Sequence, residues 1–317
     1  MILIITSPDD THLPFVTKHL TTPYELIDVQ ALAENSPLTY DLSKTKPIIY
    51  YKNKPLSNPT AVWLRRPRYK KGDLRLPVAP PYQDYSRTAL QSHFEQLFAL
   101  FQDEAFWISD YYAIMRADNK TLQLREARNL GFKVPPAVVT SDTRAAKQFV
   151  SAHPESIVKS LARRFPMPSK DKQLVFFTKK ISPDSQPSYE GLHLAPAIFQ
   201  NAVQTAFDIR VTVVGELVFA ANIVLDAPFD GVLDWRAGHQ NDSLKITPYN
   251  LPKKTADLCV ALTKRLGLNF GAIDLIQDVN GIIWFIEINT NGQWAFVEEQ
   301  TDQPIGKAIA SLLETHS

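Results

Sequence analysis

Three oxygen-bearing side chains near the C-terminal end of the chain stand in segments that otherwise consist mainly of apolar residues. Asp274 lies within "FGAIDLIQD" (270–278), and Glu287 and Asn289 lie within "GIIWFIEIN" (281–289). Both segments are rich in β-branched and aromatic residues, which is typical of partly buried strands. An unpaired carboxylate is costly to bury in such a strand, so each of these carboxylates needs a partner.

The connection between the two segments predicts how these side chains face one another. The dipeptide Asn280–Gly281 separates them, and Asn-Gly between apolar runs is a strong signal for a β-hairpin with a two-residue turn. With that turn, counting outward along both strands places Asp274 opposite Glu287. Because side chains alternate between faces with a period of two, Asn289 joins them on one face.

The facing carboxylates favour a bound divalent cation. Two like charges roughly 5 Å apart between Cβ atoms destabilise a strand pair, and a cation between them reverses that effect. Two carboxylates and an amide offer oxygen ligands and leave room for water or phosphate, which suits Mg²⁺ held to a nucleotide. The alternative is a surface hairpin whose carboxylates face water, since a wider turn would shift the register and separate Asp274 from Glu287.

The composition excludes several broad classes. The chain has 317 residues, 34 of them basic and 33 acidic, so its formal net charge of +1 gives no bulk attraction to nucleic acid or membrane. A basic segment, 65–75, raises the alternative of a nucleic-acid patch, which the near-neutral total disfavours. One cysteine, Cys259, excludes an internal disulfide framework, and no signal-peptide or membrane-spanning pattern opens the chain, so we expect a cytoplasmic location.

The N-terminal region is predicted to be a small α/β unit. The segment "MILIIT" (1–6) is a predicted strand, and "TAVWLRRP" (60–67) is another that ends in Arg65 and Arg66. Apolar residues recur at helical spacing over 85–106, which predicts a helix. There is no G-x-G-x-x-G motif after the first strand, so a dinucleotide site is not supported there.

A change of pattern near residue 112 predicts a domain boundary. Asn119 is a suitable cap for a helix that begins at Lys120 and ends at Gly131. Further along, Lys159 stands inside the apolar strand "ESIVKSLA" (155–162). A lysine in such a place is commonly an edge residue whose ammonium reaches water, so Lys159 alone does not define a site.

Several segments resemble one family. Lys120, Lys159, the arginine of "DIRVTVVG" and the hairpin with the facing carboxylates provide what a triphosphate site needs when the chain has no glycine-rich loop. The segments that carry the resemblance are "DIRVTVVGELVFAA", "LDWR", "FGAIDL", "FIEINTNGQWAFVEEQTDQPI" and "WLRRP". They resemble the ATP-grasp superfamily, and specifically the peptide-maturing ligases that make graspetides of the microviridin type.

The resemblance implies a fold and a division of the chain. The fold class is α/β (α+β), with the ATP-grasp fold following an N-terminal pre-ATP-grasp α/β domain. The implied limits are 1–111 for the N-terminal domain, 112–195 for the central ATP-grasp subdomain and 196–317 for the C-terminal subdomain with the metal-binding hairpin.

The resemblance also implies roles for individual residues. Lys120 and Lys159 would contact the phosphates and adenine of ATP from one side. The strand that holds the base and ribose would contribute Gln200, Asn201, Val203 and Asp208.

The remaining residues would hold the metal and stabilise the transferred group. Asp274, Glu287 and Asn289 would bind Mg²⁺. Arg210 and Arg236 would face the γ-phosphate and the acyl phosphate formed from it.

The chemistry implied is carboxylate activation by ATP, followed by attack of an amine or hydroxyl to form an amide or ester. The expected partner is a ribosomally made precursor peptide that is cyclised through Asp or Glu side chains, with neither nucleic acid nor membrane involved; a homodimer is compatible with this. Arg65 and Arg66 are either a solvated strand end or groups that face acidic side chains of the peptide. Two other functions remain open: a ligase that appends amino acids to a peptide or protein, like the ribosomal-protein glutamate ligases, and a nucleotide-gated binding protein without chemistry.

Overall fold

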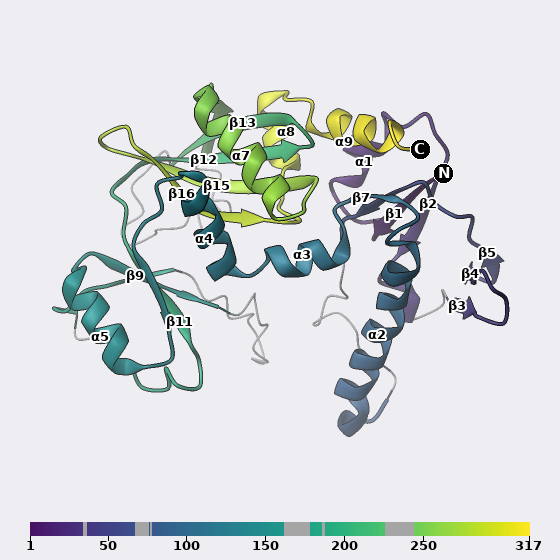
Figure 1. The fold of residues 1–317 in the computed structure, drawn as a ribbon, viewed down its shortest axis with the longest axis horizontal. Coiled ribbons are helices and arrows are strands. Elements are labelled where there is room, and N and C mark those ends of the chain that lie inside the picture. The colour runs from purple at the N-terminus through teal and green to yellow at the C-terminus, as the bar shows by residue number, and fades with distance from the viewer. Residues whose placement is uncertain (34–36, 67–75, 77, 162–177, 186–187, 226–243) are drawn as a thin grey trace.

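The protein is described from a computed structural model with a mixed α/β architecture (Figure 1). The described residues are 1–33, 37–66, 76, 78–161, 178–185, 188–225 and 244–317. Within them the strands form four sheets. No helix in this part of the chain has the length and apolar character needed to span a bilayer.

The N-terminal sheet is parallel and buried on both faces. Its strands, in spatial order, are β2 (Tyr24–Asp28), β1 (Ile2–Thr6), β6 (Ala61–Leu64) and β7 (Phe106–Ile108). Leu3 and Ile5 of β1 pack in one core cluster, whereas Ile2 and Ile4 pack in another. Both faces of β1 are therefore covered by packed side chains, which explains why all of its residues are buried.

Helices flank this sheet. The predicted helix after "WLRRP" is α2 (Gln83–Phe101), which ends before the predicted limit because Phe106 already begins β7. Phe94, Leu97 and Phe98 of α2 pack against the same cluster as Leu3. The remaining elements of this region are α1 (Leu13–Thr17), η1 (Ala31–Ala33), β3 (Leu38–Asp41), β4 (Ile48–Tyr51), β5 (Lys54–Pro55) and η2 (Pro80–Tyr82).

A small antiparallel sheet in the middle of the chain carries Lys159. Its strands, in spatial order, are β10 (Lys179–Ile181), β9 (Ser156–Ser160), β11 (Ala197–Asn201) and β8 (Ala137–Thr140), with α5 (Thr143–Ala152) packed on one face. Because β9 is paired with β10 and with β11, Lys159 does not stand on an edge strand.

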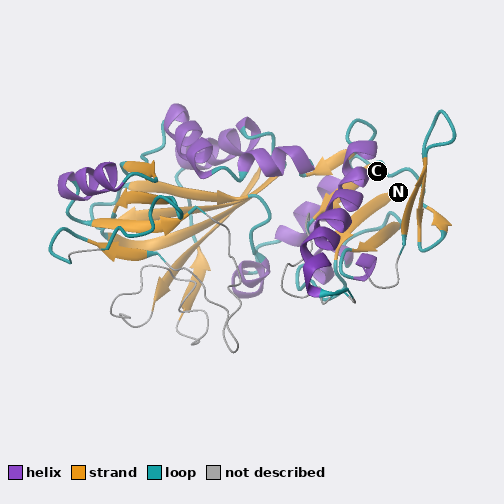
Figure 2. Cartoon of the chain, turned by 90° about the horizontal axis from the view of Figure 1, so that it is seen from below, coloured by secondary structure: helices purple, strands orange, loops and turns teal. Residues whose placement is uncertain are grey.

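A five-stranded antiparallel sheet carries most of the other candidate residues. Its spatial order is β14 (Leu244–Pro248), β13 (Leu217–Leu225), β12 (Thr205–Val214), β15 (Phe270–Asp278) and β16 (Ile283–Asn289). Helix α7 (Lys253–Arg265) packs on one face through Leu262, which shares a cluster with Val211 and Ile273. Figure 2 shows helices lying along one side of this sheet. Residues 202–204 connect the small sheet directly to it.

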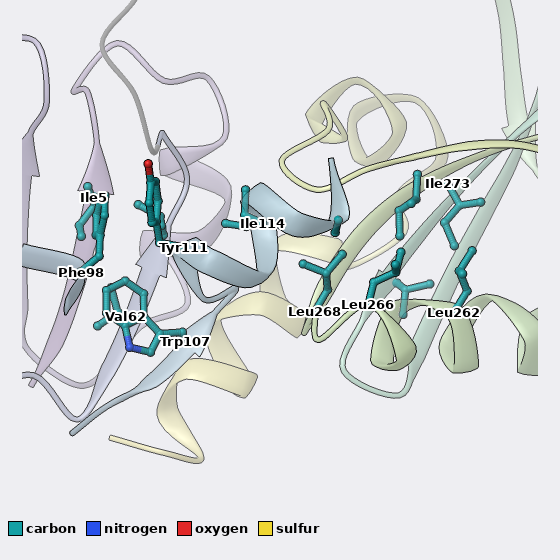
Figure 3. Packing of buried hydrophobic residues seen from close by; sticks show 14 of the residues in the cluster. Ile5, Val62, Phe98, Trp107, Tyr111, Ile114, Leu262, Leu266, Leu268 and Ile273 are labelled. Carbon is teal, nitrogen blue, oxygen red and sulfur yellow. The ribbon is translucent and has the colours of Figure 1, made fainter. Parts of the chain in front are cut away.

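One core cluster joins the N-terminal sheet to the five-stranded sheet. Figure 3 shows Tyr111 and Ile114 of α3 (Tyr111–Ala117) between Val62 on one side and Leu266 on the other. The predicted limit between residues 111 and 112 therefore falls at the start of a helix that both sheets share. The limits of the three predicted domains stay predictions.

The C-terminal helix α9 (Ile305–Glu314) returns to the N-terminal region and packs on α1, as Figure 1 shows. Gly306 allows this approach, because a Cβ at that position would collide with the carbonyl oxygen of Phe15. The pairing of the two ends of the chain thus depends on a missing side chain.

Gly306→Ala is expected to destabilise the protein by about 1–3 kcal/mol, the range for overpacking, although alanine is the better helix former. Chemical denaturation of the variant measures this. Lys307→Ala, on the exposed face of the same helix, is the matched control and should change the unfolding free energy by less than about 0.5 kcal/mol. A Gly306→Ala variant as stable as the wild type would show that α9 does not need the close contact.

Candidate active site

Asp274 of β15 lies opposite Glu287 of β16, as predicted, but the predicted two-residue turn is wrong. The Asp278 N–H donates to the carbonyl of Ile282, so the turn spans residues 279–281. This wider turn shifts the register by one residue. A β-bulge at Ile286 then shifts it back, because Leu275 pairs with Phe285 whereas Asp274 pairs with Glu287.

The carboxylate of Asp278 explains the wider turn. It accepts hydrogen bonds from Trp284 Nε1 (2.9 Å) and from the backbone N–H groups of Ile282 (2.8 Å) and Asn280 (2.9 Å). These bonds, the one from Trp284 foremost, lower the pKa of Asp278. Gly281 adopts φ +80°, a left-handed conformation that glycine tolerates best. A two-residue turn would give up this set of hydrogen bonds.

The two facing carboxylates are held together by an amide and neutralised by two cations. Asn289 Nδ2 donates to Asp274 Oδ2 (3.0 Å) and to Glu287 Oε1 (3.1 Å). Lys120 Nζ lies 2.7 Å from Glu287 Oε2, and an Nη of Arg210 lies 3.0 Å from Asp274 Oδ1. The structure therefore brings together five of the predicted site residues in a cluster whose formal charges sum to zero.

The cluster lies on the face of the sheet opposite α7. Ile209 and Val211 of β12 pack in the hydrophobic core with Leu262 of α7. Because side chains alternate along a strand, Arg210 between them points to the opposite face of the sheet. Only about 3% of Arg210 and 8% of Asp274 are exposed, which strengthens their electrostatic interaction relative to a surface pair.

Helix α4 (Lys120–Leu130) places Lys120 at this cluster. The side-chain oxygen Oδ1 of Asn119 accepts a hydrogen bond from the Leu122 N–H and caps the start of the helix, as predicted. Gly131 ends the helix at φ +100°, also as predicted. The helix packs along β16. Its first residue therefore reaches Glu287.

Gln123 is a site residue that the sequence did not indicate. Its Nε2 donates to the carbonyls of Ile288 (2.9 Å) and Ala117 (2.7 Å), and its Oε1 accepts from the Ile288 N–H (3.2 Å). The side chain thus pairs with the backbone of β16 between Glu287 and Asn289, and it is 1% exposed. Its position one turn after Lys120 on the same helix face was the available signal.

A second group lies in the small sheet. Lys159 Nζ donates to Gln200 Oε1 (3.0 Å), and Gln200 is buried. Asn201 ends β11, and its N–H donates to the Pro136 carbonyl (2.9 Å); Val203 follows in the connection to the larger sheet. Asp208 lies on β12, on the same face as Arg210. Arg236 lies outside the described residues.

The cluster fits a cation that prefers oxygen ligands. Within the described residues no group of three or more His, Cys, Asp or Glu side chains is placed to bind a metal. Two carboxylates and an amide are a smaller set, which suits Mg²⁺ because that ion keeps water and phosphate among its ligands. Turning over the amide of Asn289 would present its oxygen to the same point.

The chain matches many solved structures but neither a protein-family model nor a curated protein. Macrocyclase MdnC from Microcystis aeruginosa MRC, bound with precursor peptide MdnA, has a TM-score of 0.85 at 27% identity, with 100% of both chains covered.

Two further structures extend this likeness. The Chryseobacterium gregarium RiPP-associated ATP-grasp ligase, in complex with ADP and a leader and core peptide, has a TM-score of 0.87 at 24% identity, covering 100% of this chain and 97% of that one. ATP-grasp ligase PsnB, complexed with minimal precursor, Mg and ADP, has a TM-score of 0.77 at 20% identity, covering 99% and 97%.

The chain has the ATP-grasp fold. More particularly, the structures it resembles over its full length are those of RiPP macrocyclases and ATP-grasp ligases, which confirms the resemblance to peptide-maturing ligases. The roles of individual residues in this chain stay predictions.

Gln123→Leu is expected to lower the unfolding free energy by about 2–4 kcal/mol, because it leaves the buried N–H and C=O of Ile288 without their partner. Denaturant unfolding measures the change. Gln96→Leu is the control, since Gln96 is exposed and its amide donates to the carbonyl of Ser92 in its own helix. Equal stability of the Gln123→Leu variant and the wild type would contradict the role given to this side chain.

Proposed function

We propose that the protein is an ATP-dependent ligase that activates Asp or Glu side-chain carboxylates of a ribosomal precursor peptide as acyl phosphates. An amine or hydroxyl of the same peptide then displaces phosphate, which forms a macrocyclic amide or ester. The observation that carries the proposal is the charge-balanced cluster of Asp274, Glu287, Asn289, Lys120 and Arg210, in a fold that matches peptide-bound ATP-grasp enzymes.

The charges of the cluster suit a nucleotide phosphate site. Asp274, Glu287 and Asn289 would hold Mg²⁺, which when bound neutralises phosphate charge. Lys120 and Arg210 now neutralise the two carboxylates. With Mg²⁺ beside Asp274 and Glu287, the positive charges of Lys120 and Arg210 would be available to the phosphate oxygens of ATP. Phosphoryl transfer depends mainly on such positioning and charge neutralisation.

The small sheet supplies the other side of the nucleotide site in this proposal. Lys159 contacts Gln200 near the end of β11, and Gln200, Asn201 and Val203 would hold the base where β11 leads into the connection between the sheets. Asp208, at the start of the larger sheet, would contact the ribose.

The acyl-transfer step needs no nucleophile from the protein. The carboxylate oxygen of the peptide attacks the γ-phosphorus and releases ADP. The acceptor nitrogen or oxygen then attacks the acyl carbon and releases phosphate, so the peptide loses one water per crosslink. Arg210, and in the same role Arg236, would stabilise the charge on the transferred phosphoryl group.

The expected setting follows from the same proposal. The peptide is the macromolecular partner, nucleic acid and membrane are not needed, and the enzyme works in the cytoplasm, as a monomer or a homodimer. The near-neutral net charge of +1 supports the absence of a nucleic-acid partner.

The proposal is tested by incubating the purified protein with ATP, Mg²⁺ and the peptide encoded beside its gene, followed by mass spectrometry. Loss of one water per crosslink together with ADP release is the expected result. A gain of one amino-acid mass would instead indicate a ligase that appends amino acids. ATP binding without ADP release would indicate a binding protein.

Lys159→Ala should weaken ATP binding by about 1.5–3 kcal/mol, the range for hydrogen bonds to charged groups. Calorimetry with a non-hydrolysable ATP analogue measures the affinity. Lys147→Ala is the matched control, because Lys147 lies exposed on α5 of the same subdomain. Unchanged affinity in the Lys159→Ala variant would make Lys159 a structural residue.

Arg210→Lys keeps the charge but loses the planar fork that meets phosphate oxygens at two points, so kcat should fall by a larger factor than the KM for ATP rises. Steady-state ADP release at saturating peptide distinguishes the two effects. A variant with a raised KM and an intact kcat would show that Arg210 binds only the ground state.

A further inference from the structure

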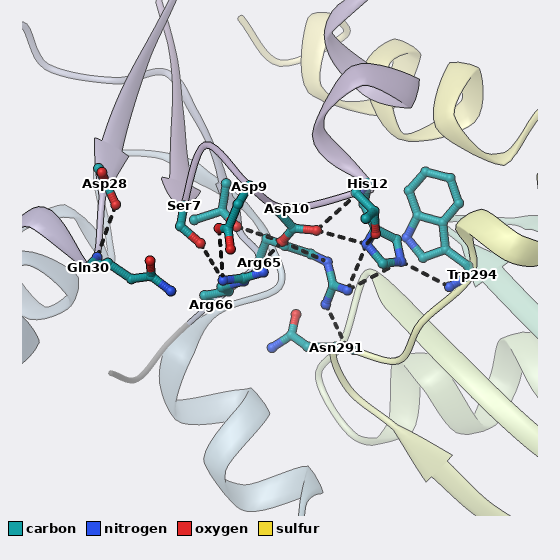
Figure 4. Close-up of polar contacts among 12 residues, drawn as sticks. Ser7, Asp9, Asp10, His12, Asp28, Gln30, Arg65, Arg66, Asn291 and Trp294 are labelled. Atoms are coloured by element: carbon teal, nitrogen blue, oxygen red, sulfur yellow. Dashed lines mark hydrogen bonds and ion pairs between the residues drawn. The ribbon is translucent and has the colours of Figure 1, made fainter. Parts of the chain in front are cut away.

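A buried charged network lies where two parallel strands of the N-terminal sheet end (Figure 4). In the order β2-β1-β6-β7, the chain continues to one side of β1 first and to the other side later, while the strands stay parallel. The residues that follow β1 and β6 therefore meet at the carboxyl ends of these two neighbouring strands. Arg65 follows β6 and is 6% exposed, whereas Asp10 and His12 follow β1 and are 3% and 1% exposed. Three polar side chains are thus withdrawn from water at one place.

Asp10 holds the network together. Its Oδ1 lies 2.8 Å from His12 Nδ1, and its Oδ2 accepts from Thr6 Oγ1 (2.6 Å) and lies 3.6 Å from Arg65 Nε. Burial alone would raise the pKa of Asp10, but the hydrogen bond with His12 and the charge of Arg65 outweigh it and hold the pKa well below its usual range. The carboxylate therefore stays ionised and neutralises the buried guanidinium.

The network hydrogen-bonds to the backbone of loop 290–294, which follows β16, the strand that carries Glu287 and Asn289. An Nη of Arg65 donates to the carbonyl of Asn291 (2.6 Å), and the Trp294 N–H donates to His12 Nε2 (3.2 Å). An ionised carboxylate can only accept and a backbone N–H can only donate, so Nδ1 carries the proton and donates to Asp10, whereas Nε2 carries the lone pair. An Nη of Arg65, 3.3 Å from Nε2, also lies beside this ring. Burial, foremost, lowers the pKa of His12, which favours this neutral form.

The loop 290–294 lies between two residues of the cluster region. The predicted metal ligand Asn289 precedes it, and Phe296, whose ring lies near Arg210, follows it. Asn289 bonds both carboxylates. Phe296 lies in α8 (Ala295–Thr301), and its ring centre lies 6.0 Å from the guanidinium carbon of Arg210. At Gly292 a Cβ would collide with Ala272 of β15, so the loop lies directly against the strand that carries Asp274. A displaced loop would therefore move both Asn289 and Phe296.

We propose that Arg65 and His12 are positioning residues, which hold loop 290–294 so that Asn289 and Phe296 keep their places at the metal and phosphate cluster. The effect on catalysis rests on the proposed function, whereas the effect on the loop does not. In this account Arg65 neither faces solvent nor contacts the peptide. Its neighbour Arg66 makes its side-chain contacts with Ser7, Asp9 and Asp10 instead.

The test compares Arg65→Lys with Arg66→Lys, since both arginines lie beside Asp10 and, within the described residues, only Arg65 hydrogen-bonds to the loop. Hydrogen exchange of the ligand-free protein, followed by mass spectrometry, should show faster exchange over 290–296 in Arg65→Lys but not in Arg66→Lys. The Mg²⁺ concentration for half-maximal ADP formation should rise about tenfold in Arg65→Lys, the lower end of the range for groups that orient metal ligands, with the KM for peptide unchanged.

His12→Phe is the second variant, because it removes the acceptor for Trp294 N–H while Asp10 and Arg65 keep each other neutral. It should show the same faster exchange. If both variants keep the wild-type exchange over 290–296 and the wild-type Mg²⁺ requirement, the positioning role is wrong. If exchange rises but no peptide or nucleotide supports turnover in the wild type, the loop assignment stands and the proposed function fails.

Discussion

The structure depends on two carboxylates that face each other across a pair of strands. Asp274 and Glu287 lie at paired positions on β15 and β16, where like charges would otherwise repel. The chain compensates with Asn289 between them and with Lys120 and Arg210, one cation for each carboxylate. Because the cluster is balanced within the protein, it is compatible with a folded state before any ligand binds.

The elements around this pair come from all parts of the chain. Lys120 and Gln123 come from α4, and Arg210 comes from β12. Arg65 and His12, which hold the loop after β16, follow strands of the N-terminal sheet. Gln123 fixes the backbone of β16 from one side, and the network around Asp10 fixes the loop after β16 from the other. The strand that carries Glu287 and Asn289 and the loop that follows it are therefore held by two separate sets of buried polar contacts.

Much of this arrangement could be predicted from local patterns. Alternation and the Asn-Gly signal were enough to pair Asp274 with Glu287, yet the agreement depends on two deviations that cancel. The turn is one residue wider because Asp278 accepts three hydrogen bonds, and the bulge at Ile286 restores the register. The helix from Lys120 to Leu130 was predictable because its cap residues act locally.

The long-range polar contacts could not be predicted in the same way. The position of Gln123 one turn after Lys120 indicates that it lies near the site, but nothing local indicates that its amide pairs with Ile288, which is 165 positions away. Arg65 could be read as a solvated strand end, and its burial depends on Asp10 and on a loop from the far end of the chain. Such contacts arise only when distant segments pack together.

The central claim is that Asp274 and Glu287 together make a magnesium-dependent nucleotide site, and thermal unfolding with ADP tests it most directly. ADP with Mg²⁺ should raise the unfolding temperature of the wild type more than ADP with a chelator does, because a ligand that binds only the native state stabilises it. Glu287→Gln should stay folded and lose this Mg²⁺-dependent increment, whereas Asp278→Asn, in the same hairpin but at its turn, should keep it. A Glu287→Gln variant that retains the full increment would contradict the account.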